Sequence, residues 1–270
     1  KFSTPLQAAD NELLVRDVIE DVFTSHGLEV TFKAKPIHGV AGSGGHTHVG
    51  VSAKLKDGSI KNLFAPKDLK EDYLSELGYG ALMGLLYNYE VLNPIVTASN
   101  DGFNRLVPGF EAPVCIVTSL GHSYEIPSRN RSVLVGLIRD MKNPKTVRFE
   151  LRSPSPLSNT YLVIAGCYQT MLDGIKAAAK SGLSTKELEK ELSKNVGEES
   201  FYLEKDRAYR DENDVFEHYS LEERNARFGI PPATVYENMK NLEIYASKLK
   251  SLKQGDVFTD SIIESFKIGA

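Results

Sequence analysis

The segment from residue 147 to residue 152, Val-Arg-Phe-Glu-Leu-Arg, constrains the fold of this 270-residue chain most strongly. Apolar and charged residues alternate strictly in it, and a period of two is the spacing of a β-strand with one buried face. The apolar side chains must point into a core, while Arg148, Glu150 and Arg152 share the opposite face. The chain therefore has to contain a sheet that is packed on one side and charged on the other.

This charged row has two interpretations. A carboxylate between two guanidinium groups can hold a cation at Glu150, while Arg148 and Arg152 bind phosphate or carboxylate oxygens in bidentate fashion. The alternative is a solvated ladder of salt bridges, which contributes little to stability. The row alone favours neither interpretation.

A second candidate site contains His46 and His48, in a stretch from residue 46 to 55 that has the pattern of a strand. Alternate residues of a strand point to one side, so both imidazoles would face the same cavity. Neutral imidazole binds divalent metals and protonated imidazole donates to phosphate, whereas the alternative is two half-exposed histidines bonded to their neighbours. The preceding turn from Gly42 to Gly45 lets backbone amides approach a ligand, although it matches neither a Walker loop nor a dinucleotide fingerprint.

A third candidate is the run from residue 104 to 113, Asn-Arg-Leu-Val-Pro-Gly-Phe-Glu-Ala-Pro. Its prolines and glycine stiffen a turn that presents Arg105 at one end and Glu111 at the other. Arg129 and Arg131 follow further along the chain. A surface turn has a similar composition, but arginines that recur around one carboxylate favour an anionic, phosphorylated ligand.

Local patterns predict an α+β fold, in which an antiparallel sheet comes first and helices pack on it and follow it. Asp10 is the expected N-cap of a helix that ends at Gly27, and the alternation over 28–32 predicts a strand. Asp57 and Gly58 have hairpin-turn chemistry. Further helices are expected over 69–90 with Pro94 beyond the end, over 161–179, after the capping-box pair Ser184 and Glu187, and behind Pro231 and Thr259.

We expect these elements to form a single domain over residues 1–270. Residues 1–180 would contain the sheet and the candidate site, and residues 181–270 would form a mainly helical C-terminal segment. Within that segment, the charged stretch from 198 to 227 is expected to be a solvated surface of helix and loop.

The composition limits the partners of the chain. Its 32 lysines and arginines and 36 acidic residues give a net charge of -4, which provides no general attraction to nucleic acid or to an anionic membrane. No apolar run reaches the roughly 18 residues of a spanning helix, and Cys115 and Cys167 lack zinc or CxxC spacing. We therefore expect a cytoplasmic protein with buried thiols. Because the sequence begins at Lys1 and enters a helix pattern at once, we also expect a piece of a longer protein.

The motifs together are more specific than each alone. Their order is Gly-Ser-Gly-x-His-x-His, then Asn-Arg-Leu-Val-Pro-Gly-Phe-Glu-Ala-Pro, then Arg-Asn-Arg-Ser, then Arg-Phe-Glu-Leu-Arg-Ser-Pro-x-Pro. In this order they resemble the catalytic domain of glutamine synthetases, from about residue 6 to residue 179. The run Gly-Asp-Val-Phe-Thr-Asp from residue 255 to 260 is similar to the closing segment of that family.

The resemblance implies an ATP-dependent ligase that makes glutamine from glutamate and ammonia through a γ-glutamyl phosphate, with two divalent cations, Mg²⁺ or Mn²⁺. It also implies a homo-oligomer of stacked rings for the parent protein. Matched by position, it assigns metal binding to His46 and Glu150, nucleotide phosphates to His48 and Arg148, glutamate to Gly42, Arg105 and Arg152, the transferring phosphoryl group to Arg131, and flap closure with ammonium deprotonation to Glu111.

The chain also departs from the family pattern. Ala41 replaces an Asn, Gly50 stands where Ser is frequent, and Gly136 takes the place of a nucleotide-binding arginine, for which Arg139 is the nearest substitute. An insertion over 122–127 lengthens the flap region. The N-terminal β-grasp domain of the family and its other metal-binding carboxylates do not occur in this sequence.

Two metal ligands make a poor site for a hard cation, so we expect the isolated chain to be inactive. An uncovered sheet edge and apolar surface would also favour a non-native dimer. Two other functions stay open: a γ-glutamyl ligase that uses a polyamine or another amine, and a non-catalytic relative that binds a nucleotide.

Overall fold

The sheet that the alternating segment requires is present. The computed structural model describes residues 2–110 and 112–268, and within them a four-stranded sheet has the order β1-β6-β5-β4. Its strands are β1 (Thr47–Val49), β4 (Thr118–Ser119), β5 (Val135–Asp140) and β6 (Asn143–Leu151). The pairs β1/β6 and β5/β6 are antiparallel as expected, but β4 runs parallel to β5. A long loop over 120–134 returns the chain to the same end of the sheet, and such a connection permits parallel pairing.

The predicted single strand over 46–55 is divided, which corrects the sequence-based prediction. After β1 the chain forms a separate hairpin of β2 (Ser52–Lys54) and β3 (Ile60–Asn62). The Asn62 side chain donates hydrogen bonds to the carbonyls of Lys145 and Val147, at 3.2 and 2.7 Å, and so occupies the edge of β6 beyond β1. The predicted turn is confirmed, because Gly58 between the hairpin strands has φ of 83°.

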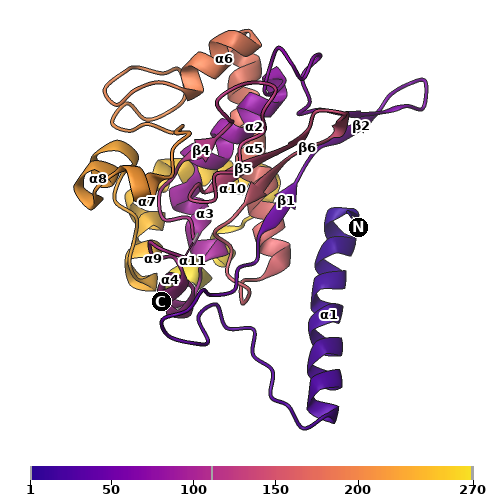
Figure 1. Ribbon diagram of the computed structural model, residues 1–270, viewed down its shortest axis with the longest axis vertical. Helices are drawn as coiled ribbons and strands as arrows, with labels where there is room; N and C mark the ends of the chain where they lie inside the picture. Colours follow the sequence, from indigo (N-terminus) through magenta and orange to yellow (C-terminus); the bar gives the residue numbers. More distant parts are fainter. Residues whose placement is uncertain (1, 111, 269–270) are drawn as a thin grey trace.

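The core forms where α2 (Glu76–Tyr87) packs against α5 (Thr160–Ser181) beside the sheet (Figure 1). A Cβ at Gly84 would overlap the carbonyl oxygen of Thr170, so glycine permits the two helices to approach closely. The helix expected over 161–179 is confirmed. The helix expected over 69–90 starts later, at the Ser75 N-cap, and continues as α3 (Tyr89–Val96).

Pro94 lies inside α3 and not beyond a helix end, which corrects the prediction for this proline. All eight residues of α3 are buried, and the helix packs against α9 (Val235–Ile244). Burial on several sides outweighs the one backbone hydrogen bond that proline cannot donate.

The first helix, α1 (Pro5–Ser25), stands beside the rest of the chain (Figure 1). Its N-cap is Thr4 and not Asp10, because Pro5 suits the first turn of a helix; its end before Gly27, which has φ of 70°, is as predicted. The carboxylate of Asp10 instead accepts a hydrogen bond from Tyr161 at 2.6 Å.

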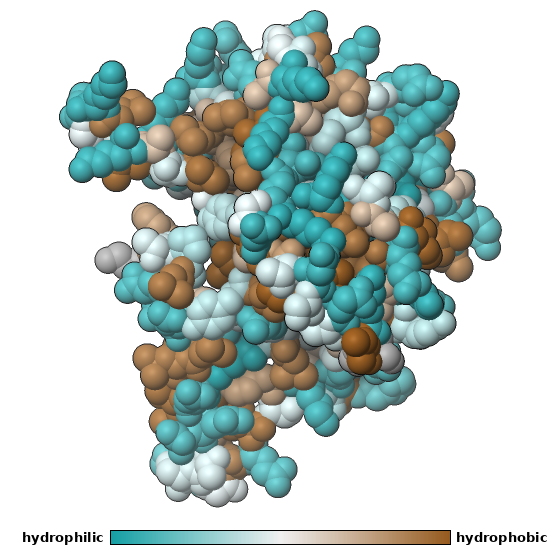
Figure 2. Space-filling view, turned by 180° about the vertical axis from the view of Figure 1, so that it is seen from behind, coloured by the Kyte–Doolittle hydropathy of each residue, from teal (hydrophilic) through white to brown (hydrophobic). Residues whose placement is uncertain are grey.

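Most apolar side chains of α1 are exposed, and Ala9 is its buried residue. Hydrophobic side chains accordingly gather along this helix at the lower left of Figure 2. The strand predicted over 28–32 does not form: this segment has no neighbouring strand in the described residues, and a strand needs one for its hydrogen bonds.

The C-terminal segment is helical, as predicted. It contains α6 (Thr185–Leu192), α7 (Val215–His218), α8 (Leu221–Phe228), α9, η1 (Ala246–Lys248), α10 (Leu249–Lys253), η2 (Gln254–Asp256) and α11 (Asp260–Ile268). Ser184 and Glu187 form the predicted capping box of α6. None of the helices in residues 2–110 and 112–268 has the length and apolar character needed to traverse a lipid bilayer.

The charged stretch over 198–227 is only partly solvated, which corrects the prediction of a solvated surface. Arg207, Asp211 and Arg224 within it are buried. Arg207 is held in the interior by an ion pair with Glu90 at 2.7 Å. A charged residue can be buried when a partner of opposite charge is buried with it, and sequence periodicity does not reveal such a partner.

Candidate active site

The two histidines and the carboxylate of the charged row meet on one face of the sheet. The register of β1 and β6 places His48 opposite Glu150. The Nδ1 atom of His46 lies 2.9 Å from Oε1 of Glu150, and Nε2 of His48 lies 3.9 Å from the same oxygen. The alternation in each strand therefore brings residues that are 104 positions apart in the sequence into direct contact.

The two arginines of the row lie on either side of Glu150 and differ in burial. The Nε atom of Arg148 donates to Nδ1 of His48 at 3.1 Å, and Arg148 is partly exposed. Arg152 is only 4% exposed, and its Nη1 atom lies 3.5 Å from Oε1 of Glu150. A solvated salt-bridge ladder does not describe this arrangement, because one arginine is enclosed and the carboxylate is mostly covered.

The surroundings of Glu150 keep its carboxylate ionised. The hydrogen bond with His46 and the charge of Arg152 lower the pKa of Glu150 to about 2, although burial acts in the opposite direction. Burial lowers the pKa of His48, so this imidazole is neutral over a wider pH range than usual. An ionised carboxylate beside a neutral imidazole is a donor set that suits a divalent cation.

Arg105 connects this cluster to the glycine turn. It ends α4 (Asn100–Arg105), and its guanidinium donates to the carbonyls of Ser153 and Arg152 at 3.1 and 2.9 Å. Its Nη2 atom lies 3.3 Å from Nε2 of His46. Burial and the charge of Arg152 lower the pKa of Arg105 to about 10.

The glycine turn follows the Arg105 side chain closely. A Cβ at Gly44 would overlap the guanidinium, and a Cβ at Gly42 would overlap the carbonyl oxygen of Ala34. The backbone amide of Gly45 donates to Pro154 at 2.7 Å, which fixes the turn beside the end of β6. Glycine is therefore required here by close backbone packing around Arg105.

Other predicted residues are not placed in this cluster. Arg131 lies in an exposed loop, and Glu111 lies outside the described residues, so their roles stay predictions. Arg139 does not replace an arginine at Gly136, which corrects that suggestion: it is buried and donates to the carbonyls of Leu69 and Asp72. Gly136 itself pairs with Glu150 across β5 and β6, and positions an odd number apart in a strand point to opposite faces.

The loop that leads to Arg131 is anchored by residues that no sequence motif indicated. The carboxylate of Glu212 accepts hydrogen bonds from the amides of Leu120 and Gly121, at 3.3 and 2.7 Å, and from the hydroxyl of Ser119. Further along, the side chain of Asn130 donates to the carbonyl of Asn213 at 2.7 Å. These partners are more than 80 positions apart, so no local pattern could have indicated them.

The residues present provide only part of a metal site. Within the described ranges, no three or more His, Cys, Asp and Glu side chains are grouped so that they could hold an ion. His46 and Glu150 offer two donors, whereas Mg²⁺ takes six ligands in near-octahedral geometry. These residues alone therefore do not fit a complete Mg²⁺ site, and further ligands have to come from elsewhere.

The chain is similar to a known family and to several curated proteins. It matches the family model "Glutamine synthetase, catalytic domain" over residues 1–245. The glutamine synthetase of Clostridium saccharobutylicum is 36% identical over 176 residues, which cover 65% of this chain and 36% of that protein. The glutamine synthetase of a Nostoc species is 38% identical over 176 residues, which cover 65% of this chain and 34% of that protein.

A protein named 3-hydroxylaminophenol mutase, from Cupriavidus pinatubonensis, is 39% identical over 175 residues, which cover 65% of this chain and 34% of that protein. In all three comparisons the chain spans about a third of the length of the relative. The similarity therefore concerns one segment of these longer proteins.

Proposed function

Because the chain belongs to the glutamine synthetase catalytic-domain family, we propose that the full-length protein is an ATP-dependent ligase that joins ammonia to glutamate. The observation that supports this proposal most directly is the cluster on the sheet. There an ionised Glu150 contacts His46 and is flanked by Arg152, and Arg105 lies beside the same imidazole. This cluster can bind a cation and an anionic substrate side by side.

The proposed roles follow the chemistry of each group. His46 and Glu150 contribute two ligands of a divalent cation, and His48 and Arg148 bind nucleotide phosphates. Arg105, Arg152 and the backbone at Gly42 bind glutamate, because guanidinium groups match carboxylates in geometry and charge. For Arg131 and Glu111 we propose contact with the transferring phosphoryl group and closure of the flap.

In this proposal glutamate is phosphorylated on its side-chain carboxylate, and ammonia then displaces phosphate from the acyl phosphate. When bound, the divalent cations offset negative charge on the phosphate oxygens. The arginines hold the two substrates in line and offset further charge, and Glu111 accepts a proton from ammonium. Exclusion of water matters because an acyl phosphate hydrolyses readily.

We also propose that the 270-residue chain alone does not catalyse this reaction. Its described residues supply two of the donors that a cation needs, and it spans about a third of the related enzymes. The purified chain is expected to show no γ-glutamyl transfer with Mg²⁺ or Mn²⁺. Detectable transfer above that of a Glu150→Gln variant of the same chain would contradict this second proposal and leave the first intact.

The main test is phosphate release by the full-length protein with ATP, glutamate and ammonia. The expected result is release that requires all three substrates and falls by roughly 100-fold or more in Glu150→Gln. Glu199→Gln makes the same chemical change at a side chain that is 78% exposed and serves as the control. Equal loss in both variants would show a general defect and count against the assigned site.

The acceptor is tested in the same assay. Ammonia is compared with a polyamine such as putrescine, and turnover of 3-hydroxylaminophenol is measured because one relative carries the name of a mutase for that compound. Product with ammonia supports the proposal. Product only with an organic amine, or only rearrangement of the hydroxylamine, would replace it with the corresponding activity.

A further inference from the structure

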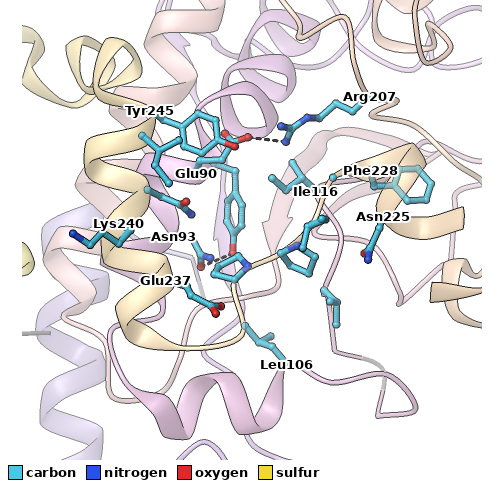
Figure 3. Close-up of a pocket in the computed structure, with 18 of the residues that line it drawn as sticks. Glu90, Asn93, Leu106, Ile116, Arg207, Asn225, Phe228, Glu237, Lys240 and Tyr245 are labelled. Carbon is cyan, nitrogen blue, oxygen red and sulfur yellow. Dashed lines mark hydrogen bonds and ion pairs between the residues drawn. The ribbon is translucent and has the colours of Figure 1, made fainter. Parts of the chain in front are cut away.

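A cavity of about 580 Å³ lies between α3 and α9. Its other walls include residues 103 and 106, residues 113, 114 and 116, residues 206 and 207, and the end of α8 with the segment that follows it (Figure 3). The clustered side chains of His46, His48, Glu150 and Arg152 do not line it, although Leu106 and Pro113 of the run from 104 to 113 do. Its volume falls within the range of about 300–1,000 Å³ that is typical of small-molecule sites.

The walls of the cavity are largely aromatic and apolar. The lining side chains of this kind include Phe103, Leu106, Ile116, Phe228, Pro231 and Tyr245. Flat aromatic and proline side chains in the lining favour a planar ring system, because such a ring can pack against them with little loss of conformational freedom. The walls thus select for shape and not for charge.

The charged groups that line the cavity are already paired. Each has a partner in the protein: Arg207 with Glu90 at 2.7 Å and with Asp206 at 3.5 Å, Lys240 with Glu243 at 3.2 Å, and Glu237 with the backbone amide of Ala233 at 2.7 Å. A charged ligand would therefore bury its charge without a free counter-ion, which is unfavourable.

The polar groups that remain open include three carboxamides and the Nε atom of Arg207, which is buried and has no hydrogen-bond partner in the described residues. Asn93 comes from α3, Asn225 from α8 and Asn241 from α9, and all three line the cavity. Asn93 is 4% exposed; its Oδ1 accepts the hydroxyl of Tyr89 at 2.9 Å, while its amide NH₂ donates to no group in the described part of the chain. Within the same part, the side chains of Asn225 and Asn241 have no hydrogen-bond partner either.

We propose that this cavity is a second ligand site, which binds a neutral, planar aromatic molecule that carries a carboxamide or lactam. An amide both donates and accepts, as do the open groups of Asn225 and Asn241. The NH₂ group of Asn93 is open to the cavity, so a ligand carbonyl can accept a hydrogen bond from it in place of water. The proposal does not depend on the activity of the sheet cluster.

Two probes of the same shape test the proposal on the 270-residue chain. Quinoline-3-carboxamide is neutral, whereas quinoline-3-carboxylate carries a negative charge at pH 7, and both are titrated by isothermal calorimetry. The carboxamide is expected to bind with a Kd below about 1 mM, at least about tenfold more tightly than the carboxylate. Equal binding of the two probes, or no binding of the carboxamide at that concentration, would overturn the proposal.

Variants locate the binding. Asn225→Leu and Asn241→Leu each remove an open carboxamide from a different helix and are expected to weaken carboxamide binding by about fivefold or more. Asn11→Leu makes the same change on exposed α1 and should leave binding unaltered. Thermal unfolding identifies any variant that fails to fold, and the other variant then decides. Unchanged affinity in a folded cavity variant would place the probe elsewhere and refute the assignment.

Discussion

Glu150 and Glu90 each have cationic or imidazole partners, and they differ in what surrounds them. Glu150 on the sheet contacts His46 and Arg152, and the His46 and His48 side chains are 33% and 41% exposed. Glu90 in the interior pairs with Arg207 at 2.7 Å and with Lys248 at 3.1 Å, and Lys248 is 3% exposed. Both clusters join segments that are about a hundred or more positions apart.

The difference separates a structural cluster from one that can act on a ligand. Around Glu90 the charged groups form ion pairs with one another, and Lys248 also pairs with Glu204 at 2.9 Å. Around Glu150 the imidazoles are open to solvent on one side and lie next to a glycine turn. An interior cluster of paired charges mainly holds elements together, whereas an open cluster retains ligand capacity.

The largest expected effect on stability comes from a substitution in the interior cluster around Glu90. Glu90→Gln leaves Arg207 and Lys248 buried beside a neutral amide, so we expect the free energy of unfolding to fall by about 3–5 kcal/mol. Urea denaturation followed by circular dichroism measures the loss. The exposed change Glu199→Gln should stay within about 0.5 kcal/mol of the parent. A loss below about 1 kcal/mol for Glu90→Gln would mean that water reaches Arg207 and Lys248 and replaces the carboxylate, which would contradict the assignment of a buried structural cluster.

Glu212 tests whether the stability cost of removing a carboxylate depends on its burial or on the partners that it has in the protein. The side chain of Glu212 is 15% exposed, as is that of Glu150. In contrast to Glu150, it accepts hydrogen bonds from two backbone amides, and it forms an ion pair with Arg210 at 2.6 Å. We expect Glu212→Gln to lower the free energy of unfolding by about 2 kcal/mol. If Glu212→Gln and Glu150→Gln cost the same in urea titrations, exposure alone would explain both.

The change Glu150→Gln in the open cluster should cost about 1 kcal/mol in stability, less than the other two changes, because the two imidazole partners retain access to water although Arg152 is buried. The same change is expected to abolish ligase activity in the full-length protein. The combination of a small stability loss with a large activity loss identifies a functional group. Full activity in a stably folded Glu150→Gln protein would remove Glu150 from the proposed site.

The smallest expected effect is a dependence on pH. The pKa of Glu150 is lowered to about 2, from 4.5, so its contribution to stability is complete above pH 4.5 and declines as the pH falls toward 2. The difference in unfolding free energy between the parent chain and Glu150→Gln, measured with EDTA present, should be constant above about pH 5 and shrink below it. A difference that grows on acidification would reverse the assigned direction.

Local chemistry predicted several elements well. The alternation at residues 147–151 became β6, and the pair Ser184 and Glu187 became a capping box. Each depends on residues within a few positions of one another, where periodicity and hydrogen-bond geometry are decisive. The meeting of His46 and Glu150 also follows from alternation, once both strands belong to one sheet.

The failures concern partners that lie far away in the sequence. The segment over 28–32 has the pattern of a strand but no neighbouring strand in the described residues, and Arg207 belongs to a charged stretch yet lies in the interior. Pro94 continues in a helix because the whole of α3 is buried. In each case the deciding energy comes from packing or pairing that the local pattern does not contain.

The sequence by itself determined which side chains of the charged row share a face, the capping box at Ser184 and Glu187, and the family to which the chain belongs. The tertiary structure decided that His48 stands opposite Glu150, that Arg105 reaches His46 past the glycine turn, and that Glu90 and Arg207 close on each other. Side-chain direction follows from backbone geometry over two to four residues, whereas register and burial follow from the best packing of the whole chain.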